Sequence, residues 1–493
     1  MHMWGIASGE RLDLWIILGG TLLTFMVRFF MKGSHIVIGD DTGTYLATLN
    51  FIRGEDLSGH GGERPPLVGY FLWPFVVMFG TLAGAKTAAL VASVVGSFAF
   101  YLVAKKVTSP VTAAIGGLCF IWLPIYAETL GWGFLSILVI ALALLSLWGW
   151  IRYAEAPSLD RALSAAAITA VMAYLNQTAV PVIGLVVGIA LLTLVIPKPL
   201  QHLKFLIPAG VLLVFLTLGS IPYAMAHISN LSVPTSDGTP VDLSIELKDP
   251  ITSMIAMVGI LIFYLAGRKI GGIPGTLIMV GGIITSITQA LTIPGSLAFI
   301  TVLGRSILWL WMFAALVGIW GIPVLFRKYF GKLSGGQYRS FAALGIAFAF
   351  IYLSSGWFLR FESVMPHYTT LDNDSVVALE WVREQTSPDE KVGAYPLTLG
   401  FYVNGLANRA TVTTSPDDGE SDGMAYGEAV RGWWRVDDRA VRCTLGYMTE
   451  CDVYLPELGV KYLLTRDDPQ TPLSPVFSSG EMMVYRLEGE KGW

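Results

Sequence analysis

Long apolar runs dominate the first 358 positions of the chain, and the remaining positions lack them. A helix needs about 20 apolar residues to cross the hydrocarbon core of a bilayer, and most of these runs come close to that length. The pattern therefore predicts about eleven transmembrane helices. Their expected ranges are 12–31, 82–104, 110–127, 131–151, 162–175, 180–196, 205–224, 251–267, 273–293, 303–326 and 341–358.

Two shorter segments between the first two runs predict external surface helices. The apolar spacing over residues 40–53 suits a helix with one apolar and one wet side, and Gly54 ends it. Residues 68–79 follow the pair Pro65-Pro66, which stops any helix, and they are short and aromatic-rich. The apolar positions of the first helix are Tyr45, Leu46, Leu49, Phe51 and Ile52, interrupted by Thr48, Asn50 and Arg53.

The last part of the chain has the pattern of an α/β domain. Residues 375–385 suit a helix capped by Asp372 or Asp374. Short β-branched or aromatic segments bounded by Pro, Gly or Asp predict strands. The expected strands are 391–395, 410–414, 460–465 and 482–487. We therefore expect a transmembrane domain over 1–358, with its first external loop at 32–81, and an α/β domain over 359–493.

Composition and charge sharpen this division. The chain is 54% hydrophobic and only 14% charged, with a mean hydropathy of +0.61, whereas soluble domains carry roughly 25% charged residues. Residues 360–493 hold 12 Lys and Arg against 22 Asp and Glu, a net charge of −10. Since the whole chain carries −4, the membrane part carries +6, from 20 basic and 14 acidic residues. Nothing in the pattern indicates a nucleic-acid partner.

The basic residues also predict the orientation in the membrane. With a cytoplasmic N-terminus, 13 of the 20 basic residues of the membrane part fall in inner loops. Counting 68–79 as a span would turn every later loop outward. The first apolar run is too long for a cleavable signal peptide and lacks a small-residue cleavage site. We therefore expect a multi-pass cell-membrane protein whose loop 32–81 and C-terminal domain are both extracytoplasmic.

Candidate chemistry gathers in the first external loop. Asp40 and Asp41 are adjacent carboxylates, and Arg64 returns beside them later in the loop. Carboxylates and an arginine at a membrane face make a plausible place to handle a phosphate-bearing lipid. His60 could bind a metal together with the acidic pair.

The two cysteines of the expected external domain are Cys443 and Cys451, with seven residues between them. An oxidising compartment allows a local disulfide. Two reduced thiols in a core are an equally good interpretation, because spacing alone does not choose.

The loop also carries a family resemblance. An acidic pair, then Tyr45, then Gly54, then Arg64-Pro65-Pro66-Leu67 resembles the first external loop of the C-type glycosyltransferases. That superfamily includes protein O-mannosyltransferases and lipid A aminoarabinose transferases. Its members transfer a sugar from a polyprenyl-phosphate carrier to an acceptor on the outer side of the membrane. The resemblance implies a glycosyltransferase using a hexosyl or pentosyl donor, with a protein, glycan or lipid acceptor.

The resemblance also assigns roles outside this loop. Glu128, after the third span, is the candidate for the family's second carboxylate. Arg305 stands where relatives place a residue that meets the lipid phosphate, and a guanidinium offers phosphate a bidentate fork. Tyr223 and His227 resemble the end of the span that precedes a substrate-covering loop. Tyr45 belongs to the same expected lipid-phosphate set.

The implied mechanism is a single displacement with inversion. Arg64 and Arg305 hold the lipid phosphate, and one carboxylate of the pair acts as general base on the acceptor hydroxyl. Gly54 lies 14 positions after Asp40, the usual family interval, whereas Tyr45 fits better when counted from Asp41, so the choice stays open. Either no cofactor is required or a divalent metal, Mg or Mn, bridges the pair.

Two other classes of protein compete with the enzyme. A non-catalytic scaffold or lipid-handling subunit could retain the fold, because Asn176-Gln177 stands where related enzymes often carry Thr-Lys. A secondary transporter would need internal repeats and charges within its spans. The chain shows no repeat and few such charges.

Overall fold

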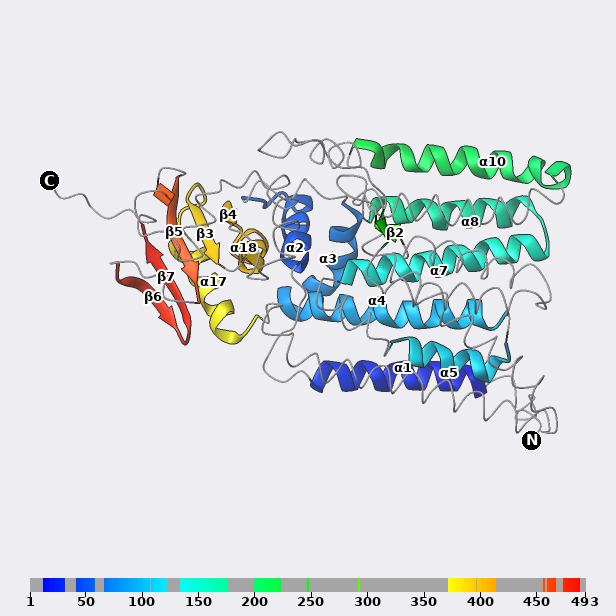
Figure 1. The fold of residues 1–493 in the computed structure, drawn as a ribbon, viewed down its shortest axis with the longest axis horizontal. Coiled ribbons are helices and arrows are strands. Elements are labelled where there is room, and N and C mark those ends of the chain that lie inside the picture. Colours follow the sequence, from blue (N-terminus) through cyan, green and yellow to red (C-terminus); the bar gives the residue numbers. More distant parts are fainter. Residues whose placement is uncertain are drawn as a thin grey trace.

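The chain is described by a computed structural model. It describes residues 12–31, 41–57, 66–106, 108–121, 134–175, 199–222, 246–247, 291–292, 371–395, 397–413, 455–456, 459–466 and 473–487. Long helices lie side by side at one end of the molecule, and a sheet lies at the other (Figure 1). The helices are α1 (Leu12–Met31), α4 (Thr81–Ala104), α5 (Pro110–Ile121), α7 (Phe134–Glu155), α8 (Leu159–Val171) and α10 (Pro199–Thr217).

The apolar pattern located these helices well. Within the described part of the chain, three helices are long and apolar enough, by length and composition, to cross a membrane. They are Thr81–Ala104, Leu138–Glu155 and His202–Ser220. The expected spans 180–196, 251–267, 303–326 and 341–358 lie outside the described residues, so the total of about eleven stays a prediction.

One expected span ends too late. Residues 273–293 were assigned to a single helix on hydropathy, but Leu291–Thr292 form a short strand, β2. It pairs antiparallel with β1 (Glu246–Leu247), which lies in the substrate-covering loop expected after His227. Leu and Thr fit either structure in an apolar run, and the pairing partner lies about 45 residues away, beyond the reach of a local pattern.

Basic side chains mark the end of the helices that lies away from the sheet. Lys106 on the α4 side forms an ion pair with Glu155 at the end of α7, with Nζ 2.6 Å from Oε2. Arg161 of α8 donates to the carbonyl of Arg152 at 3.2 Å. Both contacts join the ends of neighbouring helices, as expected for basic residues gathered on one side of a membrane.

A buried acid reinforces this end. Asp13 in α1 is fully buried, and Tyr101 of α4 donates its hydroxyl to the carboxylate. Lys105 donates to Asp13 Oδ2 at 3.1 Å and to the Tyr101 hydroxyl at 2.9 Å. An unpaired charge inside a helix bundle is costly, so these partners explain why the acid is tolerated and why α1 and α4 meet here.

The C-terminal domain contains a five-stranded sheet in the order β4-β3-β5-β7-β6. β3 is parallel to both β4 and β5, whereas β7 is antiparallel to β5 and β6. The strands are β3 (Lys391–Tyr395), β4 (Thr411–Thr413), β5 (Val460–Thr465), β6 (Pro475–Ser479) and β7 (Met482–Arg486). The sequence predicted all of these except β6, which has mostly exposed residues and a proline at its start.

Helices complete this domain on the side of the sheet nearest the membrane helices (Figure 1). α17 (Asn373–Gln385) begins at Asp372, whose side chain accepts from the Ser375 amide at 2.8 Å, so Asp372 is the cap. α18 (Leu397–Tyr402) continues into η4, a π-helical turn (Val403–Ala407) that the sequence did not predict.

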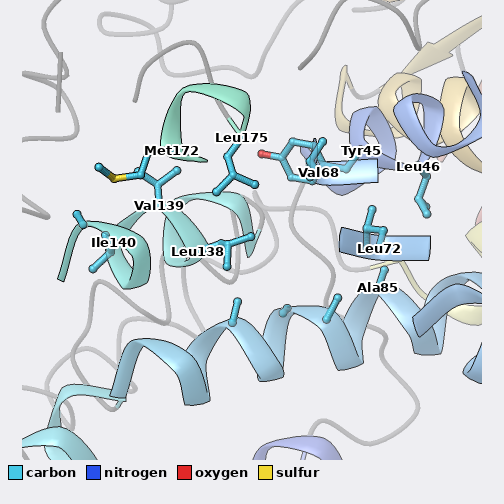
Figure 2. Packing of buried hydrophobic residues seen from close by; sticks show 14 of the residues in the cluster. Tyr45, Leu46, Val68, Leu72, Ala85, Leu138, Val139, Ile140, Met172 and Leu175 are labelled. Atoms are coloured by element: carbon cyan, nitrogen blue, oxygen red, sulfur yellow. The ribbon is translucent and has the colours of Figure 1, made fainter. Parts of the chain in front are cut away.

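A continuous apolar core joins the two parts of the molecule. Tyr45 and Leu46 of α2 (Asp41–Ile52) belong to the same buried cluster as Leu72 of α3 (Leu67–Phe79) and Leu175, which follows α8 (Figure 2). Tyr402 and Val403 of the C-terminal domain belong to it as well. The C-terminal domain is therefore packed against the membrane part through α2.

Candidate functional site

The first two turns of the helix that begins at the acidic pair are buried, whereas Phe51 near its end is exposed. α2 begins at Asp41, and every side chain from Thr42 to Leu49 is buried. The expectation of a surface helix with a wet side is wrong for this stretch: Thr48, expected to face water, has no exposed surface and donates to the Thr44 carbonyl at 3.0 Å. The wet side is covered by α18 and η4, which lie between the sheet and α2 (Figure 1).

Gly54 ends α2 as the sequence predicted. Its amide bonds to the Phe51 carbonyl at 3.0 Å, and the next amide, of Glu55, bonds to the Asn50 carbonyl at 2.8 Å. This is the Schellman pattern, in which the residue after the helix takes the left-handed conformation that glycine adopts without strain. Gly54 has φ +71°. The chain therefore turns sharply at the end of α2.

The opposite side of α2 packs on α3. A side chain at Gly69 of α3 would come within 3.3 Å of the backbone of Leu49, so the two helices approach closely there. Tyr45 is only 1% exposed, and its hydroxyl points toward the side of the cluster where Leu175 lies (Figure 2). The ring is therefore part of the packing between α2 and the membrane helices.

The C-terminal domain approaches the first turn of α2 at two glycines. A Cβ at Gly405 of η4 would lie 2.9 Å from the carbonyl carbon of Gly43 and closer still to its oxygen. No side chain fits in that gap without moving one backbone. About two turns further along, Asn50 donates its side-chain amide to the Gly405 carbonyl at 3.0 Å.

A second contact holds the chain just after α2. The Asn408 side chain donates to the Glu55 carbonyl at 2.6 Å and accepts from the Leu57 amide at 2.9 Å. Asn408 is also the C-cap of η4 and has φ +54°, a conformation that asparagine tolerates better than most residues. We call these contacts of Gly405 and Asn408 with residues 43–57, including the bond from Asn50 to Gly405, the interdomain clamp.

Arg409 connects the clamp to the C-terminal end of α17. Its guanidinium is buried and donates to the Arg383 and Thr386 carbonyls at the end of α17, at 2.6 and 2.7 Å. It also donates to the carbonyls of Ala407 and Asn408, at 3.3 and 3.1 Å. Burial, and then repulsion from Arg383, lowers the pKa of Arg409 from its ordinary value. Arginine nevertheless stays charged in proteins, so all these bonds are charge-assisted.

Of the residues expected to form the site, the structure places one side chain, that of Tyr45, and the backbone of Asp41. Asp41 is the first residue of α2, where the free amides of a helix favour a negative charge. Within the described ranges no group of three His, Cys, Asp or Glu side chains could hold a metal ion. The following lie outside the described residues: Asp40, His60, Arg64, Glu128, Tyr223, His227, Arg305, Cys443 and Cys451.

Three buried polar atoms near the clamp escaped the sequence analysis. Among the described side chains, Thr42 Oγ1, Thr44 Oγ1 and Asn404 Oδ1 are buried without a hydrogen-bond partner. Thr42 and Thr44 flank Gly43, and Asn404 precedes Gly405. Each such group costs about 1–3 kcal/mol. A Thr or Asn in a short helix gives no local sign of burial, so this signal exists only in the fold.

No family model matches the sequence, and no curated protein matches it. Solved structures do match the fold. The oligosaccharyltransferase of Archaeoglobus fulgidus in its apo form is 13% identical, with a TM-score of 0.55, over 92% of this chain and 69% of that one. The same protein has been solved in complex with Zn and sulfate.

Two further matches extend over almost the whole chain. ArnT from Cupriavidus metallidurans, bound to undecaprenyl phosphate, is 15% identical with a TM-score of 0.53, over 97% of this chain and 99% of that one. The arabinofuranosyltransferase AftD from Mycobacteria is 14% identical with a TM-score of 0.55, over 98% of this chain and 40% of its own length.

These matches define the fold class. The chain has the fold of the C-type glycosyltransferases, with membrane helices and a C-terminal domain. The resemblance carried by the loop motif is thereby confirmed at the level of the fold. At identities of 13–15% the likeness extends to the fold alone.

Proposed function

We propose that this protein is a membrane glycosyltransferase that moves a sugar from a polyprenyl-phosphate carrier to an acceptor on the extracytoplasmic face. The proposal rests on two observations together, the loop motif and the fold. A motif of acidic pair, Tyr45, Gly54 and Arg64-Pro65-Pro66 lies on and around a helix in a fold shared with three transferases of different specificity.

The donor is the part of the reaction that the comparisons support best. ArnT is bound to undecaprenyl phosphate, and an archaeal oligosaccharyltransferase from Archaeoglobus fulgidus has been solved with a dolichol-phosphate. In this chain Arg64 and Arg305 are the proposed phosphate partners, since a guanidinium matches phosphate with two parallel hydrogen bonds. Tyr223 and His227 complete the proposed donor site, and Tyr45, which is 1% exposed, would support it from within the packing of α2.

The acid pair supplies the proposed chemistry. One of Asp40 and Asp41 accepts the proton of the acceptor hydroxyl as its oxygen attacks the anomeric carbon. The bond from that carbon to the lipid phosphate breaks, so the configuration inverts and the phosphate leaves on its carrier. Glu128 is the proposed second carboxylate of the site.

A metal would add to this chemistry without changing the assignment. The acid pair and His60 offer oxygen and nitrogen ligands that suit a divalent ion such as Mg or Mn. The Zn and sulfate in the Archaeoglobus oligosaccharyltransferase show that a protein of this fold accepts a metal. When bound, the ion would neutralise charge at the phosphate or orient the carboxylates.

The proposed orientation places this chemistry outside the cytoplasm. Lys106, Arg152 and Arg161 lie just after α4, near the end of α7 and near the start of α8. Figure 1 shows these helix ends away from the C-terminal domain. If that end is cytoplasmic, as basic residues favour, α2 and the C-terminal domain lie outside. The acceptor is then a protein, glycan or lipid of the cell envelope.

The test is release of free lipid phosphate by the protein in liposomes. A panel of radiolabelled undecaprenyl-phosphate hexoses and pentoses is supplied with a cell-envelope extract as acceptor. Asp40→Asn and Asp41→Asn should both remain folded, and one of them should lower the rate by about 10²–10⁴-fold. Glu55→Gln is the matched control, because it removes an exposed carboxylate of the same loop that pairs with Arg53 at 3.1 Å.

Two results would contradict the proposal. Wild-type rates in both aspartate variants would move the active site elsewhere. If the protein releases no lipid phosphate from any donor in the panel but still binds undecaprenyl phosphate, a lipid-handling scaffold with the same fold is favoured.

A further inference from the structure

The interdomain clamp joins two segments of the chain that are about 350 residues apart. Asn50 and Gly405 are separated by 355 positions, and Asn408 is separated from Glu55 by 353. The membrane-side segment lies between the two parts of the proposed site. Gly43 comes two residues after Asp41, and Leu57 comes seven residues before Arg64.

The first half of the clamp fixes the start of α2. Because a Cβ at Gly405 would overlap the Gly43 carbonyl, the two backbones touch directly and α2 cannot move toward η4. The Asn50 bond to the Gly405 carbonyl prevents the opposite movement. η4 is a π-helical turn, a rare conformation that is concentrated at functional sites.

The second half fixes the exit from α2. The Asn408 side chain donates to the Glu55 carbonyl and accepts from the Leu57 amide, so it bridges the two residues on either side of Asp56. Its own backbone carbonyl is held by Arg409. The exit is therefore anchored to the end of α17 through two successive residues of the C-terminal domain.

We propose that the clamp is a positioning device for catalysis, in which Gly405 fixes the helix that begins at Asp41 and Asn408 fixes residues 55–57, which precede Arg64 in the chain. This inference rests on the proposed function for its catalytic consequence. The two halves act on different parts of the reaction: the first on the group that takes the proton, the second on the group that holds the donor phosphate. The C-terminal domain is then a working part of the active site rather than an appended module.

The buried polar atoms beside the clamp agree with this role. Thr42, Thr44 and Asn404 lie within one residue of the two touching glycines, and each carries a buried oxygen without a partner among the described residues. An interface selected for stability alone would satisfy or replace such groups. These groups lower the stability of the interface, so stability alone does not account for it.

The test uses the full-length protein in nanodiscs and two matched pairs of variants. Gly405→Ala forces η4 and α2 apart, and Gly393→Ala is its control, because the added Cβ lies 3.3 Å from a side-chain atom of Val460 within the same domain and does not meet α2. Asn408→Gly keeps the left-handed backbone and removes both side-chain bonds. Asn408→Asp keeps the acceptor for the Leu57 amide but loses the donor to the Glu55 carbonyl.

The expected result is a split between kcat and KM. A displacement near 1 Å at a reacting group costs about 100-fold in rate, so Gly405→Ala should lower kcat by about 10- to 100-fold with little change in donor KM. Asn408→Gly should raise the donor KM and weaken binding of undecaprenyl phosphate by about 10-fold. Asn408→Asp should fall between Asn408→Gly and wild type, and Gly393→Ala should match wild type.

Two measurements keep the clamp separable from the proposed function. Binding of undecaprenyl phosphate and hydrogen exchange of the Leu57 amide need no turnover. If wild type transfers no sugar but Asn408→Gly still loosens this amide and weakens phosphate-lipid binding, the proposed function fails and the positioning role stands. Wild-type kcat, KM and lipid binding in both Gly405→Ala and Asn408→Gly would overturn the positioning role, whatever the reaction.

Discussion

Replacing Arg409 by methionine should open the end of α17 and loosen the clamp. Methionine fills a similar volume but donates no hydrogen bond, so the carbonyls of Arg383 and Thr386 lose donors at 2.6 and 2.7 Å. The Thr386 hydroxyl also loses its bond from Arg409 Nε, at 3.0 Å. These acceptors lie at or near the C-terminal end of α17, where backbone carbonyls have no partner within the helix.

The free-energy cost of Arg409→Met depends on the acceptors that lose their donor. A buried acceptor without a partner costs about 1–3 kcal/mol, and bonds to a charged donor contribute about 1.5–3 kcal/mol each. Removing the guanidinium also removes the penalty for burying its charge, which is several kcal/mol. Four carbonyls lose this donor, and the relieved burial penalty offsets part of that cost, which leaves a net loss of about 3 kcal/mol. This equals roughly a 100-fold increase in local opening, since 1.4 kcal/mol is tenfold.

Hydrogen exchange of the α17 amides in the full-length protein measures this opening directly. Arg486→Met is the control, because Arg486 is exposed on β7 of the same domain, and surface changes usually stay within about 0.5 kcal/mol. Arg409→Lys should be intermediate, since an ammonium keeps the charge but not the planar fork. Unchanged α17 protection in Arg409→Met would refute the argument that this arginine holds the helix end.

Three further predictions concern the site and the topology. Arg64→Ala should weaken donor use, as KM and kcat/KM for the lipid donor would show, and Arg64→Lys should restore part of it; equal loss in both variants would argue against a charge contact. A cysteine replacing the exposed Tyr70 of α3 and a tag at the C-terminus should both react with an impermeant reagent in intact cells, and labelling only after rupture would reverse the orientation. Cys443 and Cys451 should show a reductant-dependent mass shift in alkylated peptides, and its absence would mean two free thiols.

Local signals in the sequence determined most of the elements. The apolar run 12–31 gave α1 with the bounds that the structure shows, and Gly54 ended α2 because only a left-handed residue closes a helix in this way. Asp372 capped α17 as one of two candidates. Strands 391–395 and 460–465 matched β3 and β5 exactly in their ranges. Each of these depends on neighbours within a few residues, which a sequence pattern contains.

The tertiary structure decided what surrounds α2. Its apolar and polar spacing was read as one dry and one wet face, but a second domain covers the wet one, so Thr48 is buried. No local pattern marks Asn408 and Gly405, because their partners lie more than 350 positions away. The burial of Asp13 likewise depends on Tyr101 and Lys105 from another helix. Contacts between segments so distant in the chain leave no periodic trace, and only the packed fold brings them together.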